Sequence, residues 1–466
     1  MSFRKGVQMK LSQVLQTNSP GSYVAGILWL GLGTAFIAGT NQLVFEKTAS
    51  LPTAIGLLTL FVAAIVATFS LRYMRADERP TRFFVTLGTL AVAVLTFLFT
   101  NNLILLAAAW CASSWLLTEL IGHNIAWREG KNAAKRARLT FIIGDGALLA
   151  ALGLLGWHTG SWQTDAVLAG SSSLPPLLAT LVALLLVIGA GARCALPPFS
   201  GWLLSSMTAP TPVSAMMHAG FVNAGGFLLI HFAPVLEMAP FARLGAVALG
   251  LCGAIYGIGI MLVRPDVKRA LAGSTISQMG FMIMSCGLGA YAAALWHIIA
   301  HGLFKAWLFL GSGSTIGMRS AKPMAVSGAT ALVIAVGTVS AAFTILTLGK
   351  AEASLLPLLL GLATAAATFM AALGSEVRAG AKGKLLLTLI TLLTCHGAGL
   401  SLARMTVGAD GTPLVPAWAL LLLLTIFLGL WVWQQQRLST GRGLPLPIYV
   451  HLINAGSLPA AAKGDK

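Results

Sequence analysis

Long apolar runs alternate with short polar connections along almost the whole chain. About fourteen of these runs approach the roughly 20 residues that a helix needs to cross the hydrocarbon of a bilayer. They cover residues 22–41, 50–73, 83–99, 102–122, 139–157, 174–192, 212–232, 241–263, 270–289, 292–313, 325–347, 353–374, 385–403 and 414–433. Because a helix satisfies its own backbone hydrogen bonds, the pattern predicts an all-α polytopic membrane protein with about 14 transmembrane helices.

The stretch 193–211 interrupts this pattern. Pro197, Pro198, Pro210 and Pro212 would break a helix, since proline lacks the amide hydrogen and clashes with the preceding turn. An irregular backbone at membrane depth is tolerated only against protein or a wet cavity. We therefore expect a broken helix in a buried position here.

Composition and charge agree with a membrane protein. Of the 466 residues, 57% are hydrophobic and 9% are charged, whereas soluble domains have about 25% charged residues. The net charge of +17 could suggest a nucleic-acid partner, but the basic residues gather in alternate loops. They include Arg4, Lys5, Lys10, Arg72, Arg75, Arg79, Arg82, Arg128, Lys131, Lys135, Arg136, Arg138, Arg264, Lys268, Arg269, Arg319, Lys322, Arg378, Lys382, Lys384, Arg437 and Arg442. The positive-inside rule then predicts a multi-pass protein of the bacterial inner membrane with both termini cytoplasmic, in contact with lipid and not with nucleic acid.

The sequence offers no recognisable cofactor or metal site. The cysteines lie singly in or near apolar runs, without metal-ligand spacing or a disulfide pattern. They are Cys111, Cys194, Cys252, Cys286 and Cys395. No dinucleotide fingerprint, P-loop or nucleophile elbow occurs. We predict no cofactor in this chain, no electron-transfer role and no enzymatic activity of its own, and we expect the first apolar run to be an uncleaved anchor.

Ionisable residues in or beside the apolar runs are the candidate functional groups. A charge at the bilayer centre costs about 2.5–3.5 kcal/mol on insertion scales, so such residues usually face a bundle interior or a hydrated path. They are Glu119, Asp145, Arg193, His218, Lys268, His297, His301, Lys305, Lys350 and Glu352.

His297, His301 and Lys305 form the densest group of these candidates. Their spacing of four residues places the three side chains in a row on one helix face. Histidine titrates near neutral pH, so such a row could hand a proton along. The alternative is that the histidines bond neighbouring helices together. A zinc site is disfavoured, because no third ligand is indicated and the next group in the row is a cation.

The other candidates each have a structural alternative. Lys268 precedes the polar residues of 274–278, which could line a hydrated channel or bond helices together. Arg193 could reach the headgroups with its long stem, although its place beside the double proline also suits a functional role. Asp145, between two glycines, fits either helix packing or function. Glu119 lies one turn from a basic loop and could reach toward the surface.

Three segments resemble the signatures of the proton-translocating antiporter family, which includes subunit L of respiratory complex I and the large subunits of multi-subunit cation/proton antiporters. They are "PTPVSAMMHAGFVNAGGFLL" at 210–229, "PDVKRALAGSTISQMGFM" at 265–282 and "HIIAHGLFKAWLFLGSG" at 297–313. The resemblance covers about residues 70–350 in collinear order. It implies two inverted five-helix repeats, each with a broken helix, around a central row of charged residues and water.

The resemblance also implies a division of the chain and a set of path residues. We expect N-terminal transmembrane helices at 1–100, a first repeat at 101–235, a second repeat at 236–375, and C-terminal helices with a cytoplasmic tail at 376–466. Family proton-path positions fall on His218, Lys268, His297, His301 and Lys305.

The chain departs from the family pattern in its first half. Cys111, in "AWCASSW", stands where the family has a glutamate, and Glu119 is a possible substitute. Arg193 stands where the family has a lysine, and a guanidinium does not readily release a proton. Lys350 and Glu352 resemble the lysine and acid near the family's second broken helix. The resemblance therefore implies that the second half keeps its proton-transfer groups and the first half does not.

Within the family, the chain is similar to DabB-type membrane subunits of energy-coupled inorganic carbon transporters, because it is compact and is expected to lack the long lateral helix of subunit L. This likeness implies a DabA-like partner, a largely soluble zinc protein resembling a β-carbonic anhydrase. Protons or another cation would then flow through the chain and drive CO₂ hydration or bicarbonate accumulation. Two alternatives stay open. One is a pumping subunit of complex I or of a multi-subunit Na⁺/H⁺ antiporter, which should have intact glutamate and lysine positions in both halves; the other is a non-conducting scaffold that docks a partner.

Overall fold

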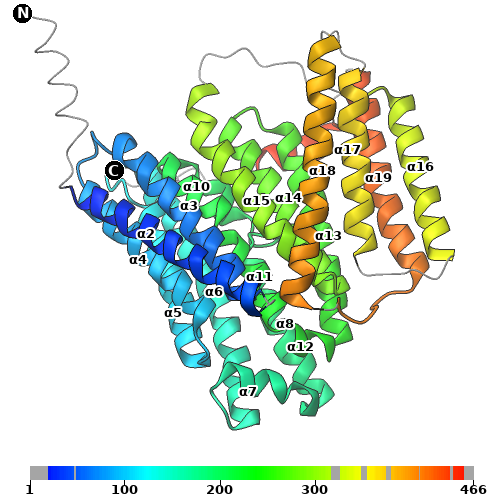
Figure 1. Ribbon diagram of the computed structural model, residues 1–466. Coiled ribbons are helices and arrows are strands. Elements are labelled where there is room, and N and C mark those ends of the chain that lie inside the picture. Colours follow the sequence, from blue (N-terminus) through cyan, green and yellow to red (C-terminus); the bar gives the residue numbers. More distant parts are fainter. Residues whose placement is uncertain are drawn as a thin grey trace, which may run out of the picture.

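The computed structural model describes residues 19–46, 49–315, 326–347, 354–373, 379–408, 410–440 and 444–455. Across these ranges the chain is almost entirely helical (Figure 1). In these ranges thirteen helices are long and apolar enough to cross a membrane, and the remaining expected run, 353–374, contains a shorter apolar helix, Leu355–Ala367. The prediction of an all-α polytopic membrane protein is confirmed.

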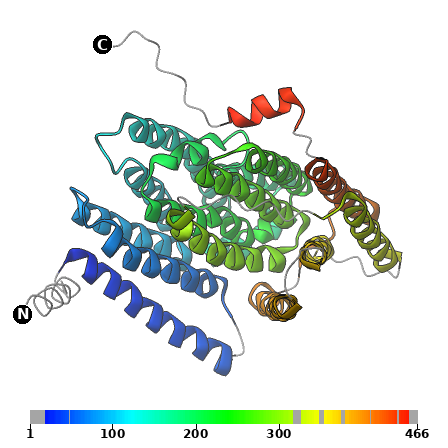
Figure 2. The ribbon, with the colours of Figure 1, turned by 90° about the horizontal axis from the view of Figure 1, so that it is seen from above.

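The first helices of the chain form one side of the bundle. They are α2 (Pro20–Asn41), which continues into a π-helical turn at Gln42–Glu46, α3 (Leu51–Tyr73), α4 (Pro80–Phe99), α5 (Leu103–Ile121) and α6 (Arg128–Thr159). Local sequence determines where several of these helices begin. The Ser50 side chain accepts from the Thr53 amide with Pro52 in the first turn, and the Asn102 side chain accepts from two amides of α5. Seen from above, α2 lies at the outer edge of this layer (Figure 2).

The predicted broken helix is present. Helix α8 (Pro176–Arg193) ends at the arginine, and the double proline lies before the short α9 (Gly201–Ser205). The run expected as one helix at 212–232 is interrupted too, which corrects that prediction. It forms α10 (Thr211–Ala219), a 3₁₀ turn at Phe221–Asn223 and α11 (Ala224–His231). The Asn223 side chain donates to Ala219 O at 2.7 Å and so satisfies a carbonyl freed by the break. Both α10 and α11 are almost fully buried.

The second half continues with long helices. The short helix α7 (Thr164–Ala169) lies between α6 and α8, and the short helix α12 (Ala233–Glu237) follows α11. The helices after α12 are α13 (Pro240–Val263), α14 (Val267–Leu288), α15 (Tyr291–Gly311), α16 (Gly328–Thr347), α17 (Leu355–Leu373), α18 (Ala379–Val407), α19 (Ala417–Ser439) and α20 (Leu446–Ile453). Helices α16 to α19 stand together beyond α13–α15, at the edge opposite α2 (Figures 1 and 2). The inverted relation of the repeats and their boundaries stay predictions.

Among the helices that the structure describes, α13 and α14 form the most closely packed pair, and small residues permit this. A Cβ atom on Gly257 would lie 2.3 Å from Ser277 N, and one on Gly280 would lie 2.4 Å from Ala254 N. Only glycine fits such contacts between two backbones, which is a common device for packing helices in membranes. This contact fixes the position of α14, whose side chains enter the site described below.

An arginine network joins the outer helices to the bundle at the end opposite the basic loops. Arg243, which is 1% exposed, donates to Gly287 O (3.0 Å), to Glu237 Oε2 (2.8 Å), and to Thr412 Oγ1 (3.0 Å) and O (2.7 Å). The Thr412 amide donates to Glu237 Oε2, and Gly411 N donates to Gly289 O. The loop between α18 and α19 is therefore fixed to α12, α13 and the end of α14.

Candidate functional site

The ionisable residues of the second half gather where α10, α14 and α15 meet. Helix α15 carries His297, His301 and Lys305 on one face, and the rings of the two histidines stack with centroids 5.7 Å apart. Helix α10 contributes His218, whose ring stacks on Phe309 of α15 at 4.1 Å. His218, His301 and Lys305 are buried. The structure thus brings the row and His218 into one cluster.

Hydrogen bonds fix one ring nitrogen of each buried histidine. Thr275 Oγ1 donates to Leu271 O at 3.0 Å, so its hydroxyl accepts from His218 Nδ1, which lies 3.0 Å away. His301 Nε2 lies 3.2 Å from His218 O, and a carbonyl can only accept, so this nitrogen carries a hydrogen. In the neutral state each ring therefore keeps one protonated nitrogen and one nitrogen with a free lone pair. Such a ring can take up a proton without losing its existing bond.

Lys305 has little to compensate its charge. Its Nζ atom donates to Leu271 O at 3.1 Å, and its side chain is 1% exposed. In the described part of the chain, none of the ion pairs includes Lys305. A buried ammonium without a carboxylate is costly, because one carbonyl replaces only part of its hydration. This position therefore favours a functional role over a packing role.

Lys268 extends the cluster toward the basic loops. It lies in the first turn of α14, which begins where the Asp266 side chain accepts from the Arg269 amide. Its Nζ atom donates to Ala209 O at 3.3 Å, in the segment before α10, and the residue is partly buried. Lys305 donates to Leu271, one turn further along α14, so the two ammonium groups follow one another along this helix.

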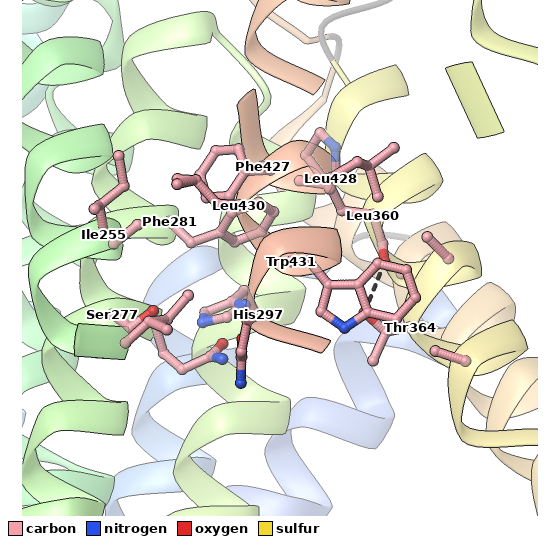
Figure 3. A pocket seen from close by; sticks show the side chains of 18 of the residues that line it. Ile255, Ser277, Phe281, His297, Leu360, Thr364, Phe427, Leu428, Leu430 and Trp431 are labelled. Carbon is pink, nitrogen blue, oxygen red and sulfur yellow. Dashed lines mark hydrogen bonds between the residues drawn. The ribbon is translucent and has the colours of Figure 1, made fainter. Parts of the chain in front are cut away.

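The other end of the row borders a large cavity (Figure 3). The cavity has a volume of about 1390 Å³ and lies between α13–α15 and α17–α19. Its walls are mostly apolar, with Phe281, Phe427 and Trp431 among them, but His297 and Ser277 contribute polar atoms. His297 Nε2 has no hydrogen-bond partner among the described residues. The row therefore runs from a cavity wall to the basic end of α14.

In the first half, the structure brings Arg193 and Asp145 together. Arg193 Nη2 lies 3.5 Å from Asp145 Oδ1, which also accepts from Trp110 Nε1 (2.9 Å) and Ser114 Oγ (3.0 Å). Trp110, Ser113 and Ser114 are not among the candidates that the sequence pattern indicates. The signal was present in "AWCASSW", because residues three and four positions apart share a helix face.

Glu119 lies in neither buried cluster. Its carboxylate pairs with Arg82 (2.6 Å) and Arg138 (3.2 Å) beside the basic loops, and its side chain is partly exposed. Lys350 and Glu352 lie outside the described residues, so the structure does not place them. In the ranges that the structure describes, no three His, Cys, Asp or Glu side chains form a group that could hold a metal ion.

Comparisons with known sequences identify similar proteins. Residues 100–391 match the family described as NADH:quinone oxidoreductase/Mrp antiporter, transmembrane. The probable inorganic carbon transporter subunit DabB of Bacillus subtilis is 42% identical over 267 residues, which are 56% of this chain and 52% of that protein. The subunit DabB1 of Halothiobacillus neapolitanus is 35% identical over 294 residues (62% and 51%). The NADH-quinone oxidoreductase subunit L of Mycobacterium tuberculosis is 36% identical over 266 residues (56% and 42%). The chain spans about half the length of the curated relatives it matches.

Solved structures share the fold over nearly the whole chain. A chain of the Mrp complex from Dietzia sp. matches with a TM-score of 0.58 and 25% identity, over 94% of this chain and 49% of that one. A chain of the archaeal membrane-bound sulfane sulfur reductase matches with a TM-score of 0.59 and 16% identity, over 93% and 94%. The second likeness concerns the fold alone.

Proposed function

Because the chain belongs to the NADH:quinone oxidoreductase/Mrp antiporter family of membrane proteins, we propose that it is the membrane subunit of an inorganic carbon pump. In this function, protons or another cation pass through its second half and drive a DabA-like zinc partner that converts or accumulates CO₂ and bicarbonate. The chain would lie in a bacterial inner membrane with both termini in the cytoplasm. The alternating basic loops support that orientation.

The buried ammonium of Lys305 is the observation that carries the proposal. A scaffold has no need of a cation with a single carbonyl as its polar contact, whereas a conducting path needs a group that can change its charge or its neighbours. The unprotonated ring nitrogens of His218 and His301 supply acceptors beside it. In the proposed path, a proton enters at His297 from the cavity and moves along α15 toward Lys305 and then Lys268 at the basic end.

Two observations favour a carbon pump over a subunit of complex I. The DabB proteins are among the most similar relatives, at 35–42% identity. The first half also has Cys111 and Arg193 where the resemblance to pumping subunits would require a glutamate and a lysine. The matches to subunit L keep a respiratory or antiporter subunit as the second candidate function.

The decisive experiment replaces Lys305 by alanine in the assembled complex. We expect uptake of labelled bicarbonate driven by an imposed cation gradient to be lost, while the partner still co-purifies. Lys131→Ala is the matched control, because Lys131 is exposed at the start of α6. Normal uptake by an intact Lys305→Ala complex would refute conduction and favour a scaffold. Co-purification of quinone-oxidoreductase subunits, in place of a zinc protein, would favour the respiratory alternative.

A further inference from the structure

The environment of Arg193 has the composition of a cation-binding site. We infer that the first half contains a site for a monovalent or guanidinium-type cation, formed by α5, α6 and the turn after α10, and that the chain fills this site permanently with its own Arg193 guanidinium. The site lies apart from the Lys305 cluster, and its occupancy can be tested without any transport assay.

Oxygen atoms of α5 and α6 provide the polar ligands. Arg193 Nη1 donates to Ser113 Oγ at 2.8 Å, and Nη2 donates to Ser114 Oγ at 2.9 Å and to Trp110 O at 3.2 Å. Among the described residues, Asp145 supplies the carboxylate of the site, 3.5 Å from Nη2. Hydroxyl, carbonyl and carboxylate oxygens are the groups that replace the hydration shell of a cation in membrane proteins.

Three aromatic rings surround the guanidinium, two of them closely. The guanidinium carbon lies 3.8 Å from the centroid of the Trp110 ring, 4.2 Å from that of Phe221 and 5.7 Å from that of Phe141. Aromatic faces attract cations through their quadrupole, most strongly where water is excluded, and Arg193 is 1% exposed. Oxygen ligands, a carboxylate and two aromatic faces together form a cage for a cation, which a snorkelling arginine would not need.

Close helix packing holds the carboxylate in this cage. A Cβ atom on Gly144 would lie 2.6 Å from the Ala192 side chain, so α6 and α8 approach closely just beside Asp145 and Arg193. The Trp110 indole and the Ser114 hydroxyl both donate to Asp145 Oδ1, which fixes that oxygen toward the guanidinium. A second cation entering this site would be repelled by the Arg193 guanidinium, and the Asp145 carboxylate already pairs with that guanidinium. If the proposed function holds, it follows that conduction is confined to the second half.

The test asks whether an external cation replaces the built-in one. Arg193→Ala removes the guanidinium and leaves its ligands in place. We expect the purified variant to melt below the wild-type protein, and methylguanidinium to raise its melting temperature by roughly 2–4 °C in a saturable way. Urea, which has a similar planar shape and no charge, serves as the control ligand. The wild-type protein, whose site is filled, should show no such rise.

A double variant, Arg193→Ala/Asp145→Asn, covers the case in which Arg193→Ala does not accumulate. It leaves no unpaired carboxylate buried in the site. This double variant retains the hydroxyls and the two rings, so methylguanidinium should still raise its melting temperature, by less than in Arg193→Ala where both can be measured. Absence of a rise in the variants, or an equal rise with urea or in the wild-type protein, would overturn the inference. None of these readouts depends on bicarbonate transport.

Discussion

Replacing Lys305 by methionine separates the energetic cost of a buried ammonium from its role in conduction. Methionine is also unbranched and fills similar space, so the change removes the charge without opening a large cavity. The structure places the Nζ atom against one carbonyl oxygen, that of Leu271, at 3.1 Å. The balance between the cost of burial and this one bond determines the sign of the stability change.

The two contributions are of similar size. Placing a lysine at the centre of a membrane helix costs about 2.5–3.5 kcal/mol, and one hydrogen bond from a charged donor returns about 1.5–3 kcal/mol. The difference lies between about 0.5 kcal/mol against methionine and about 2 kcal/mol in its favour. We therefore expect Lys305→Met to melt at the same temperature as the wild-type protein or a few degrees above it, while gradient-driven transport is lost.

Thermal melts of the purified protein, followed by proteoliposome assays on the same preparations, test this expectation. Lys305→Ala provides the comparison, because it removes the same charge and also creates a cavity, so it should melt below Lys305→Met. A fall of about 2 kcal/mol or more in Lys305→Met would refute the reasoning, since it would mean that the ammonium stabilises the fold. Retention of transport would equally contradict the role given to this residue.

Two further predictions concern the fold. Gly280→Ala should destabilise the protein by about 1–3 kcal/mol, because the new methyl group would lie 2.4 Å from Ala254 N. Gly26→Ala, where no atom lies within 4 Å, should leave the melting temperature unchanged or raise it slightly, since alanine favours a helix. Equal melting temperatures for the two variants would contradict this packing. In the loop before α4, partial burial raises the pKa of the Asp77 carboxyl, but the hydrogen bond from His123 and the Arg79 amide outweigh it, so its pKa lies below the ordinary value of 3.8. The stability that this lowered pKa contributes is present above pH 3.8 and is lost as the pH falls through the lowered pKa. Asp77→Asn should therefore melt below the wild-type protein at neutral pH, and the difference in melting temperature should shrink in acid. A difference that stays constant down to pH 3 would contradict this role of Asp77.

The sequence was sufficient for the features that depend on local pattern. The apolar runs predicted the helices because their length is set by the bilayer, and Pro197 and Pro198 predicted the break after α8 because proline cannot continue a helix. The helical period likewise predicted that His297 and His301 share a face, as their stacked rings show.

Features that depend on contacts between distant segments were not predictable in this way. The break between α10 and α11 lies in a continuous apolar run, and it is stabilised by the Asn223 side chain rather than by a proline. The pairing of Arg193 with Asp145 joins residues 48 positions apart, and no local pattern specifies it. The position of Glu119 near a basic loop indicated that it could reach toward the surface. Its pairing with Arg82, however, depends on how α4 packs against α5, which no local pattern specifies.

The network around Arg243 anchors two of the outer helices on the face opposite the basic loops. Thr412, between α18 and α19, is held by the Arg243 side chain and by Glu237, and Gly411 is held by Gly289. Helices α18 and α19 meet at this loop, and both contribute side chains to the wall of the cavity beside His297. Further along α18, the Trp296 indole donates to His396 Nδ1 at 2.8 Å and holds that helix against α15. Hydrogen bonds far from His297 along the chain therefore help to set the width of the cavity that its ring faces.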